Sequence, residues 1–282
     1  MPDCSIKVTE IYPSLTPSQK MVADYVLEHL DAMAFTTLDD VALQVGVSTT
    51  TIIRFARMMG YSGYSDMLRE IQSEVMDKVS LPKRLRNAKE KTDLDNLMAE
   101  IMQNDIDNIT HTVTDLSGDL LGQAVDKILG ARNVYVLGMH GAFSLAHYTI
   151  TRLGQIRPNV RLVQSVGMIF PEEMAGSNSK DVCIAFMFPR YSKIASDIIA
   201  WLKKMGVHIV LFTGSENTAV KKYGDIVLPC HIKGVSFKNT YAAPMCVINY
   251  IATAATIKNA AAAMEILRQT EDFFDKGYYL GL

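Results

Sequence analysis

Between residues 133 and 230, short runs rich in β-branched and apolar residues alternate with segments able to form helices. The five runs are Val134–Leu137, Val160–Val163, Val182–Phe188, Ile209–Thr213 and Ile226–Leu228. Strands that alternate with helices pair in parallel, because each helix returns the chain to the edge from which the previous strand started. The pattern therefore predicts an α/β fold, a doubly wound five-stranded parallel sheet flanked by helices.

The chain divides at a short basic segment. Residues 1–80 hold six basic and eleven acidic side chains, a net charge of −5, whereas residues 81–92 hold five basic side chains and one acidic, a net charge of +4. Within the basic segment, Pro82 disfavours a helical conformation at the residue before it, which marks a boundary. We expect a helical domain over 1–80, a basic linker over 81–92 and the α/β domain over 93–282.

Composition excludes several classes of protein. Hydrophobic residues make up 49% of the 282 and charged residues 21%, which rules out a largely disordered chain. The net charge of −2 gives no global basic field that would attract nucleic acid or a membrane. The cysteines lie far apart without a C-x-x-C motif, as buried thiols of a reducing cytoplasm would. They are Cys4, Cys183, Cys230 and Cys246.

One uncharged stretch, Asn239–Ile257, approaches the roughly 20 residues that a membrane span needs. It contains a proline and several polar residues, and many of its apolar residues are only alanine. We therefore interpret it as a buried helix that is also apolar enough to serve in a subunit interface. Residues Met1–Cys4 lack the basic and apolar regions of a signal peptide, so we expect a cytoplasmic protein with no membrane partner.

Residues 37–60 have the pattern of two helices joined by a sharp turn. Gly46 can adopt the left-handed conformation that such a turn requires, and Ser48 is placed to cap the second helix. A small Ala42 permits close packing of the helices, and an apolar Ile52 fills their junction. This spacing predicts a helix-turn-helix. A helical hairpin with a solvated polar face is the alternative.

The second of these helices separates its residues into two faces. An apolar stripe runs from Ile52 to Met59, and Thr50, Arg54 and Arg57 cluster on the opposite side, without an acidic residue. Such a helix lies in the major groove of DNA, where Arg54 would read a guanine edge and Arg57 would hold phosphate. The candidate DNA-binding residues are Ser48, Thr49, Thr50, Thr51, Arg54 and Arg57. Tyr61 and Tyr64 either touch the DNA backbone or pack under this helix.

Candidate ligand-binding residues gather at the carboxyl ends of the predicted strands, where open α/β sheets bind ligands. A glycine-bearing turn between the first strand and its helix places backbone N–H groups where an anion can bind. Arg190 offers a bidentate fork for phosphate or carboxylate, with an ordinary surface salt bridge as the alternative. The candidates are Gly138, His140, Ala142, Ser165, Arg190, Tyr191, Ser192 and Thr213.

Other chemistries lack their signatures. The chain has neither G-x-G-x-x-G nor a P-loop, which argues against a nucleotide cofactor, and its six histidines show no metal-binding spacing. Isomerisation of a sugar needs a placed base. Glu172 and Glu173 follow the second strand, but loop acids of this kind are usually solvated. We expect no metal, no cofactor and no catalytic residues.

Four motifs together resemble the RpiR/MurR-type transcription regulators of bacteria. They are Leu15–Gln19, Val45–Ser48, Thr51–Arg57 and Gly60–Tyr64, in the order in which that family carries them. The resemblance spans roughly residues 5–280 and implies an N-terminal helix-turn-helix joined to a sugar isomerase (SIS) domain. It further implies a homodimer or homotetramer assembled through the SIS domain, double-stranded operator DNA with palindromic half-sites, and a phosphosugar or related metabolite as effector.

The SIS part departs from the pattern that phosphosugar-binding members commonly show. In the first turn Gly138 is present, but His140 and Ala142 replace the second glycine and the serine of G-x-G-x-S. In the second loop, Met187–Ser192 replaces S-x-S-G-x-T and retains a hydroxyl only at its last position, which leaves Arg190 as the candidate anion ligand. We expect an effector-sensing regulator. A phosphosugar isomerase and a SIS domain that serves only dimerisation are the alternatives.

Overall fold

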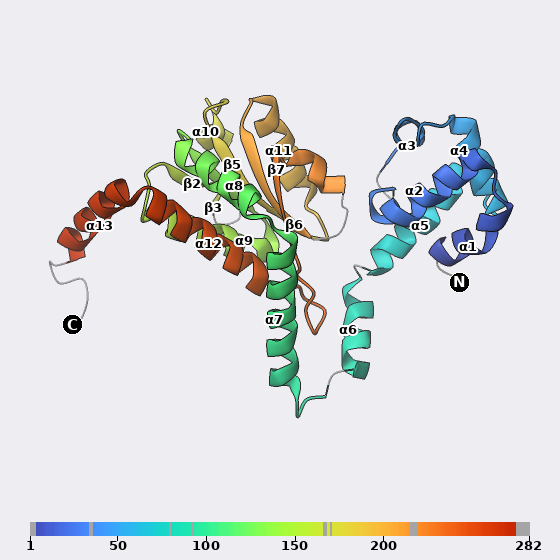
Figure 1. Cartoon of the computed structure of the whole chain (residues 1–282), viewed down its shortest axis with the longest axis horizontal. Helices are drawn as coiled ribbons and strands as arrows, with labels where there is room; N and C mark the ends of the chain where they lie inside the picture. The colour runs from blue at the N-terminus through green and yellow to red at the C-terminus, as the bar shows by residue number, and fades with distance from the viewer. Residues whose placement is uncertain are drawn as a thin grey trace. The chain divides into compact units, whose positions relative to one another are not determined.

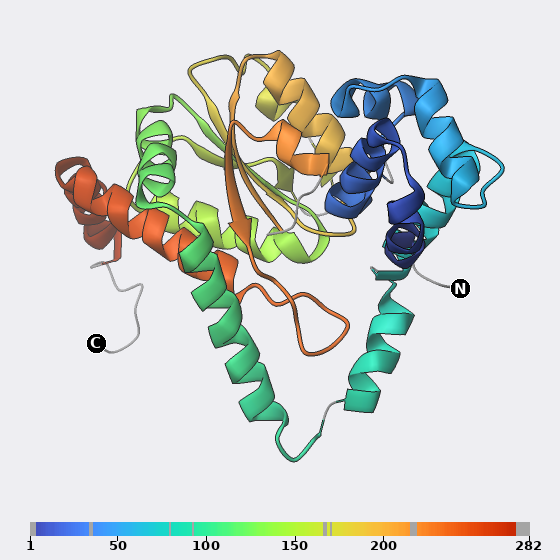
Figure 2. The ribbon, with the colours of Figure 1, turned by 45° about the vertical axis from the view of Figure 1, so that its right-hand side comes forward.

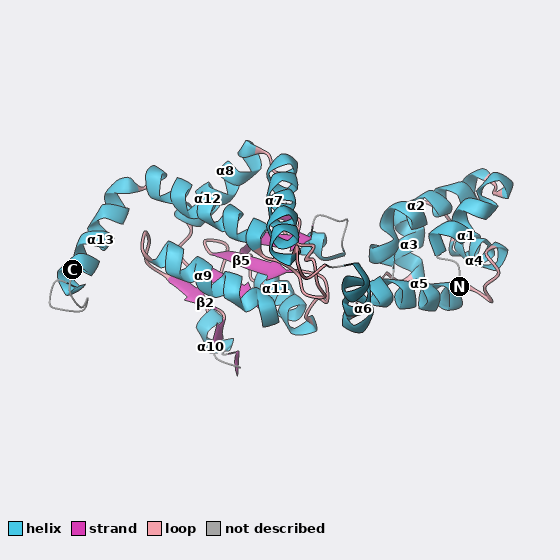
Figure 3. Cartoon of the chain, turned by 90° about the horizontal axis from the view of Figure 1, so that it is seen from below, coloured by secondary structure: helices cyan, strands magenta, loops and turns pink. Residues whose placement is uncertain are grey.

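The computed structural model of the chain describes residues 4–33, 36–78, 80–91, 93–165, 168–169, 171–214 and 219–274 (Figure 1). The chain separates into two compact units, a front unit formed by residues 1–92 and a back unit formed by nearly all of the rest. Figure 3 shows helices throughout the described part of the front unit and the strands in the back unit.

The front unit packs all but the last of its helices around a single apolar core. Its elements are α1 (Cys4–Ile11), the 3-10 helix η1 (Tyr12–Ser14), α2 (Pro17–Met33), α3 (Leu38–Val45), α4 (Thr49–Met58), α5 (Tyr64–Lys78) and α6 (Leu81–Lys91). The start of α2 follows the expected signal, because the backbone N–H of Thr16 donates to the Gln19 Oε1 at 3.0 Å, as in a capping box. Val26, Phe55 and Ile71, from three different helices, are fully buried in this core.

The segment predicted as a linker is helical. It forms α6, and Pro82 lies in the first turn of that helix. A proline there costs little, since the N–H groups of a first turn have no partner within the helix. The proline that suggested a boundary is thus part of a helix start. The basic residues of 81–91 consequently lie on a helix.

The back unit is built on a five-stranded parallel sheet in the order β2-β1-β5-β6-β7. These strands are β1 (Val134–Gly138), β2 (Val160–Leu162), β5 (Val182–Met187), β6 (His208–Gly214) and β7 (Ile226–Cys230). The prediction of a doubly wound parallel sheet is confirmed, and each predicted run corresponds to one strand. A separate antiparallel pair, β3 (Gln164–Ser165) and β4 (Met168–Ile169), follows β2.

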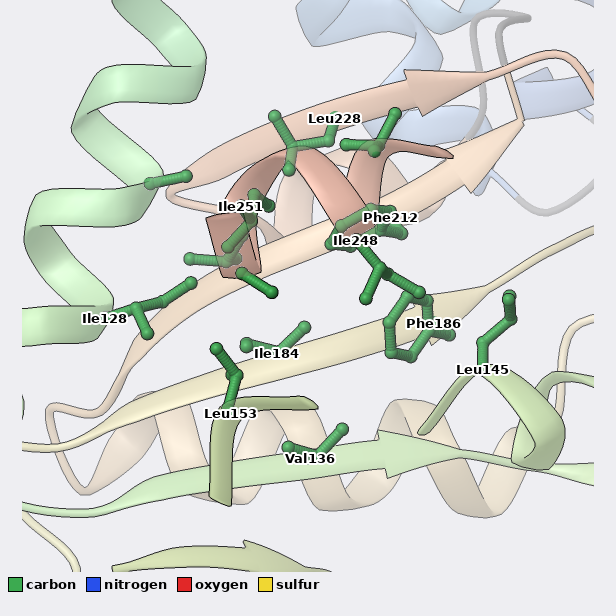
Figure 4. Close-up of a cluster of buried hydrophobic side chains, with 14 of the residues drawn as sticks. Ile128, Val136, Leu145, Leu153, Ile184, Phe186, Phe212, Leu228, Ile248 and Ile251 are labelled. Carbon is green, nitrogen blue, oxygen red and sulfur yellow. The ribbon is translucent and has the colours of Figure 1, made fainter. Parts of the chain in front are cut away.

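Helices cover both faces of the sheet. They are α7 (Leu97–Asp115), α8 (Gly118–Gly130), α9 (Phe143–Gly154), α10 (Pro171–Met174), α11 (Lys193–Lys204), α12 (Ala242–Lys258) and α13 (Ala260–Phe274), with the 3-10 helices η2 (His140–Ala142) and η3 (Ala219–Tyr223). Side chains of α8, α9 and α12 share one buried cluster with the sheet, and side chains of α11 share the other. Figure 4 shows the first cluster, in which the rings of Phe186 and Phe212 lie 4.6 Å apart between their centroids.

The uncharged stretch Asn239–Ile257 forms most of α12. Its residues Val247, Ile248 and Ile251 are buried in the core of the back unit, which confirms the interpretation as a buried helix. Among the helices that the structure describes, none is both long and apolar enough to cross a bilayer. Tyr250 and Ile257 of α12 are exposed, and their use in a subunit interface stays a prediction.

Candidate functional sites

The turn between α3 and α4 has the geometry that its sequence predicts. Gly46 has φ +74° in the left-handed region, and its N–H donates to the carbonyl oxygen of Ala42 at 3.0 Å. The Oγ of Ser48 then accepts from the backbone N–H of Thr51 at 3.2 Å and caps α4. The turn thus presents α4 as the second helix of a helix-turn-helix.

The two faces of α4 separate as expected. Ile52, Phe55 and Ala56 are fully buried, whereas Arg54 and Arg57 are exposed on the opposite side. The Nε of Arg57 donates to the carbonyl oxygen of Ser62 at 3.4 Å, which holds this side chain close to the turn after the helix. The side chain of Arg54 makes no hydrogen bond or ion pair with any residue of the described part of the chain. Its guanidinium is consequently available to a partner.

The four hydroxyl candidates at the start of α4 differ in what remains available. Ser48 and Thr50 are exposed, and Thr49 and Thr51 are partly buried. The Oγ of Ser48 and the Oγ1 of Thr51 lie 2.9 Å apart and hydrogen-bond to each other. These two hydroxyls therefore stabilise the helix start, and Thr50 is the most accessible of the set.

Tyr61 and Tyr64, whose role the sequence leaves open, pack into the front unit. Their exposed fractions are 8% and 6%. The Nζ of Lys7 donates to the Tyr61 hydroxyl at 3.2 Å, and the Tyr64 hydroxyl donates to the carbonyl oxygen of Thr36 at 2.9 Å. Burial raises the pKa of both phenols to about 12. Both tyrosines therefore pack in the core of the front unit and are not exposed for contact with DNA.

Two loops carry predicted ligand residues and are called the first and second ligand loops for that prediction. The first runs from Gly138 to Ala142 at the carboxyl end of β1. A Cβ at Gly138 would lie 2.3 Å from the carbonyl oxygen of Ala142, so only glycine permits this closure of the loop. His140 has φ +54°, a conformation that a non-glycine residue rarely adopts, and it is exposed. Strained backbone of this kind often occurs at binding sites.

The second ligand loop follows β5, which pairs directly with β1. Arg190 has φ +71°, is exposed, and makes no ion pair with any residue that the structure describes, so the salt-bridge alternative finds no support among these residues. The Oγ of Ser192 accepts from the backbone N–H of Ala195 at 3.4 Å and caps α11. Tyr191 is partly buried beside it. This loop and the first therefore lie at the same edge of the sheet.

The other two predicted ligand residues have different outcomes. Thr213 is the penultimate residue of β6, the neighbour of β5, and is fully buried. Its Oγ1 has no hydrogen-bond partner among the described residues, which is costly for a hydroxyl away from water. Ser165 lies in β3 rather than at the end of a strand of the main sheet, and its side chain lies outside what the structure describes.

Tyr241, at the N-terminal end of α12, is a site residue that sequence reasoning missed. Its ring lies against that of Phe188, with centroids 5.4 Å apart. Its hydroxyl oxygen lies 3.2 Å from the position that a Cβ on Gly141 would occupy. Burial raises the pKa of its phenol. One side chain thus contacts both ligand loops. The sequence signal for Tyr241 is an aromatic residue that follows the last predicted strand. It lies beyond the strand ends, from which the candidate ligand residues come.

The structure gives no arrangement typical of a metal or acid–base site in the described residues. Among them, no group of three or more histidine, cysteine or acidic side chains is placed to hold a metal ion. Glu172 and Glu173 are exposed on α10, and their carboxylates make no hydrogen bond or ion pair within that part of the chain. The carboxyl edge of the sheet instead combines the exposed guanidinium of Arg190, the exposed turn at His140 and the aromatic ring of Tyr241.

Two family profiles match this chain. Residues 4–78 match the helix-turn-helix domain of the rpiR family, and residues 127–254 match the SIS domain. The first match contains α3 and α4, and the second contains both ligand loops and most of α12.

Known proteins resemble the chain over most of its length. An uncharacterized HTH-type transcriptional regulator of Haemophilus influenzae is 26% identical over 224 residues, which is 79% of this chain and 77% of that protein. The HTH-type transcriptional regulator HexR of Escherichia coli is 20% identical over 273 residues, covering 94% of this chain and 92% of HexR. The solved structure of the Vibrio vulnificus NanR protein complexed with ManNAc-6P covers 99% of this chain and 100% of NanR, with 16% identity and a TM-score of 0.61. At that identity the structural likeness shows the fold.

Proposed function

This chain belongs to the RpiR family of transcription regulators that join a helix-turn-helix to a SIS domain, and on that premise we propose that its SIS domain senses a phosphorylated sugar or related metabolite. Binding of this effector would change the affinity of α4 for double-stranded operator DNA. Arg190 carries the proposal, because it is exposed at the carboxyl edge of the sheet and makes no ion pair with any described residue. A guanidinium can donate two parallel hydrogen bonds to the oxygens of one phosphate group.

The surroundings of Arg190 support an anionic effector. Loops that follow the adjacent strands β1 and β5 lie side by side, and Thr213 of the next strand adds a buried hydroxyl without a partner among the described residues. Gly138, His140, Ala142, Tyr191, Ser192 and Ser165 complete the proposed set. The NanR structure contains ManNAc-6P, a sugar phosphate, on a similar fold, which supports the same class of ligand for this chain.

For DNA, the exposed face of α4 supports direct recognition of bases. Arg54 and Thr50 would contact base edges, with Arg57 on phosphate and Ser48, Thr49 and Thr51 at the start of the helix. The net charge of −5 over residues 1–80 predicts weak binding to non-specific DNA, because few phosphates are neutralised. The basic side chains of α6 would neutralise some further phosphates.

Coupling between the two activities requires two states of the protein. We propose a homodimer or homotetramer assembled through the SIS domain, in which the effector binds one arrangement of subunits better than another. The spacing of the two recognition helices would then change, and with it the affinity for palindromic half-sites. Effector and DNA must in that case alter each other's affinity by the same factor.

The test is thermal unfolding of the full chain with a panel of phosphosugars and unphosphorylated amino sugars. A ligand at a hundred times its Kd adds about 2.7 kcal/mol to the stability, which raises the melting temperature by several degrees. The shift should appear with phosphorylated sugars and be lost in Arg190→Ala. Arg268→Ala, which removes an exposed arginine from α13, is the matched control and should keep the shift.

Two other outcomes would contradict parts of the proposal. A shift that survives Arg190→Ala contradicts the assignment of this residue, and the absence of any shift across the panel favours a SIS domain used only for assembly. A coupled turnover assay on the same sugar phosphates tests the alternative of an isomerase. The regulators of Haemophilus influenzae and Escherichia coli that resemble this chain are named as transcription regulators, which favours the non-enzymatic role.

A further inference from the structure

The loop that joins β7 to α12 is fastened to α7 by a row of polar side chains. The Nδ2 atoms of Asn104 and Asn108 both donate to the carbonyl oxygen of Lys233, at 2.7 and 2.8 Å. One turn further on, the Oγ1 of Thr112 accepts from the backbone N–H of His231 at 2.8 Å. Because the three residues are spaced by four, they lie on one face of α7. Figure 2 shows the loop leaving the sheet beside this helix.

Two members of this row are buried polar residues. Asn108 is 6% exposed and Thr112 is 1% exposed. Apolar side chains at these positions would bury as much surface, but they would remove one of the two donors to the carbonyl oxygen of Lys233 and the acceptor of the His231 backbone N–H. Buried hydrogen-bond networks of this kind fix one arrangement of the groups that they join. The row therefore sets where the loop begins relative to α7.

The far end of the loop is tied to its beginning. The backbone N–H of Thr240 donates to the carbonyl oxygen of Ile232 at 3.1 Å. The turn between them is tight, since a Cβ at Gly234 would lie 2.2 Å from the carbonyl oxygen of Lys238. Whatever holds residues 231–233 consequently holds Thr240 as well.

Tyr241 follows directly and reaches the ligand loops. It contacts Phe188 and Gly141, as described above, and its carbonyl oxygen accepts from the N–H of Met245 in the first turn of α12. A continuous set of contacts thus runs from α7 through the loop to both ligand loops. In sequence, α7 is the first helix of the back unit after the DNA-binding unit ends at Thr92.

We propose that Asn104, Asn108 and Thr112 are positioning residues that hold Tyr241 against the ligand loops, and that this contact couples the ligand site to α7 and so to DNA binding. The proposal rests on the proposed function for its DNA step. A ligand that enters between the loops displaces or fixes Tyr241, and the polar row transmits that change to α7. By reciprocity, DNA binding must alter the ligand loops through the same contacts.

A matched set of threonine variants of the full chain tests the positioning role. Thr112→Val keeps the shape and removes the acceptor, whereas Thr112→Ser keeps the acceptor. Thr114→Val makes the first change elsewhere on α7, at an exposed residue whose Oγ1 donates to the carbonyl oxygen of Thr110. The readout is hydrogen exchange at Ala142 and Thr240, whose amides are hydrogen-bonded in the structure.

Without DNA, Thr112→Val should speed exchange of both amides by about tenfold, while Thr112→Ser and Thr114→Val stay close to wild type. Faster exchange at Thr240 alone would overturn the claim that the row positions the ligand loops. Equal acceleration across the whole back unit, as a global loss of stability produces, would overturn it too.

The coupling is tested with a duplex that the full chain selects from a random pool. Its addition to wild type should change exchange at Ala142, and Thr112→Val should bind the duplex yet lose that change. A response that persists in Thr112→Val contradicts the coupling. If wild type selects no duplex, the proposed function itself fails, and the exchange without DNA still decides the positioning role.

Discussion

The carboxylate of Asp181 accepts two hydrogen bonds from Arg132, from Nε at 2.9 Å and from Nη2 at 2.6 Å. The Asp181 side chain is fully buried and also accepts from the backbone N–H groups of Asn178 and Asn133. Burial raises the pKa of this carboxyl, but the hydrogen bonds from Arg132, Asn178 and Asn133 outweigh it and lower the pKa to about 2. The network joins the turns before β1 and β5, at the edge of the sheet opposite the ligand loops.

This network should make the free energy of unfolding depend on pH in the acidic range. Because the pKa of Asp181 is lowered from 3.8 to about 2, its contribution is present above pH 4 and is lost as the pH falls toward 2. Asp181→Asn should therefore lower the free energy of unfolding by about 2 kcal/mol at pH 7, and by about half as much at pH 3. Urea unfolding at the two pH values measures both differences.

The control for that experiment is Asp197→Asn, which breaks the exposed pair with Lys193 on α11. An exposed pair contributes about 0.5 kcal/mol at most, so this variant should unfold close to wild type at both pH values. An equal deficit of Asp181→Asn at pH 7 and pH 3 would show that ionisation of the carboxyl is not the source of the effect.

The elements that sequence predicts best are those fixed by neighbouring residues. Gly46 and Ser48 determine the turn and the start of α4 through contacts within five residues, and the alternation of strands and helices determines the parallel sheet. Local patterns of this kind need no knowledge of the tertiary structure. The faces of α4 follow from the same periodicity.

The elements that sequence predicts poorly depend on distant contacts. Tyr241 joins the site because α12 brings it against Phe188, 53 positions earlier in the chain, and no local pattern contains that distance. The sequence predicts Ser165 at the end of a strand of the main sheet, but the residue belongs to the separate β3–β4 pair. A different, local ambiguity applies to Pro82, since the effect of a proline on the preceding residue does not distinguish a linker from a helix start.

Arg54 should contribute to DNA recognition by reading a base. Its loss removes up to two hydrogen bonds to a guanine, so Arg54→Ala should weaken binding to a selected duplex by about 10- to 100-fold, with a smaller loss on random DNA. Fluorescence anisotropy with the two duplexes at one salt concentration measures both affinities. Arg57→Ala should instead weaken both to a similar extent, as loss of a phosphate contact does.

Arg69→Ala is the control for the arginine series, since Arg69 is exposed on α5 and pairs with Asp66 at 3.8 Å. Its affinity for the selected duplex should stay within about twofold of wild type. An equal loss on both duplexes in Arg54→Ala would assign Arg54 to the phosphate backbone and leave base reading to the threonines.

Two glycine substitutions should change stability in opposite directions. At Gly138 an added Cβ meets the backbone of Ala142 at 2.3 Å, so Gly138→Ala must displace the first ligand loop and should cost about 2 kcal/mol. At Gly122, inside α8, a Cβ meets nothing within 4 Å, and Gly122→Ala should stabilise the chain by about 0.5–1 kcal/mol. Urea unfolding of both variants measures the contrast. A Gly138→Ala variant as stable as wild type would contradict the tight closure of the loop.

The four thiols should differ sharply in reactivity. Cys4, Cys183 and Cys230 are buried, and burial raises the pKa of the last two thiols to about 12, whereas Cys246 is exposed on α12. The nucleophile is the thiolate, so a buried thiol with a raised pKa reacts only when the fold opens. Titration of the native chain with a disulfide reagent at pH 8 should show one fast thiol, and Cys246→Ser should abolish the fast phase. Cys230→Ser is the control and should retain it. A second fast thiol would show that the core of the back unit or of the front unit opens more readily than its packing indicates.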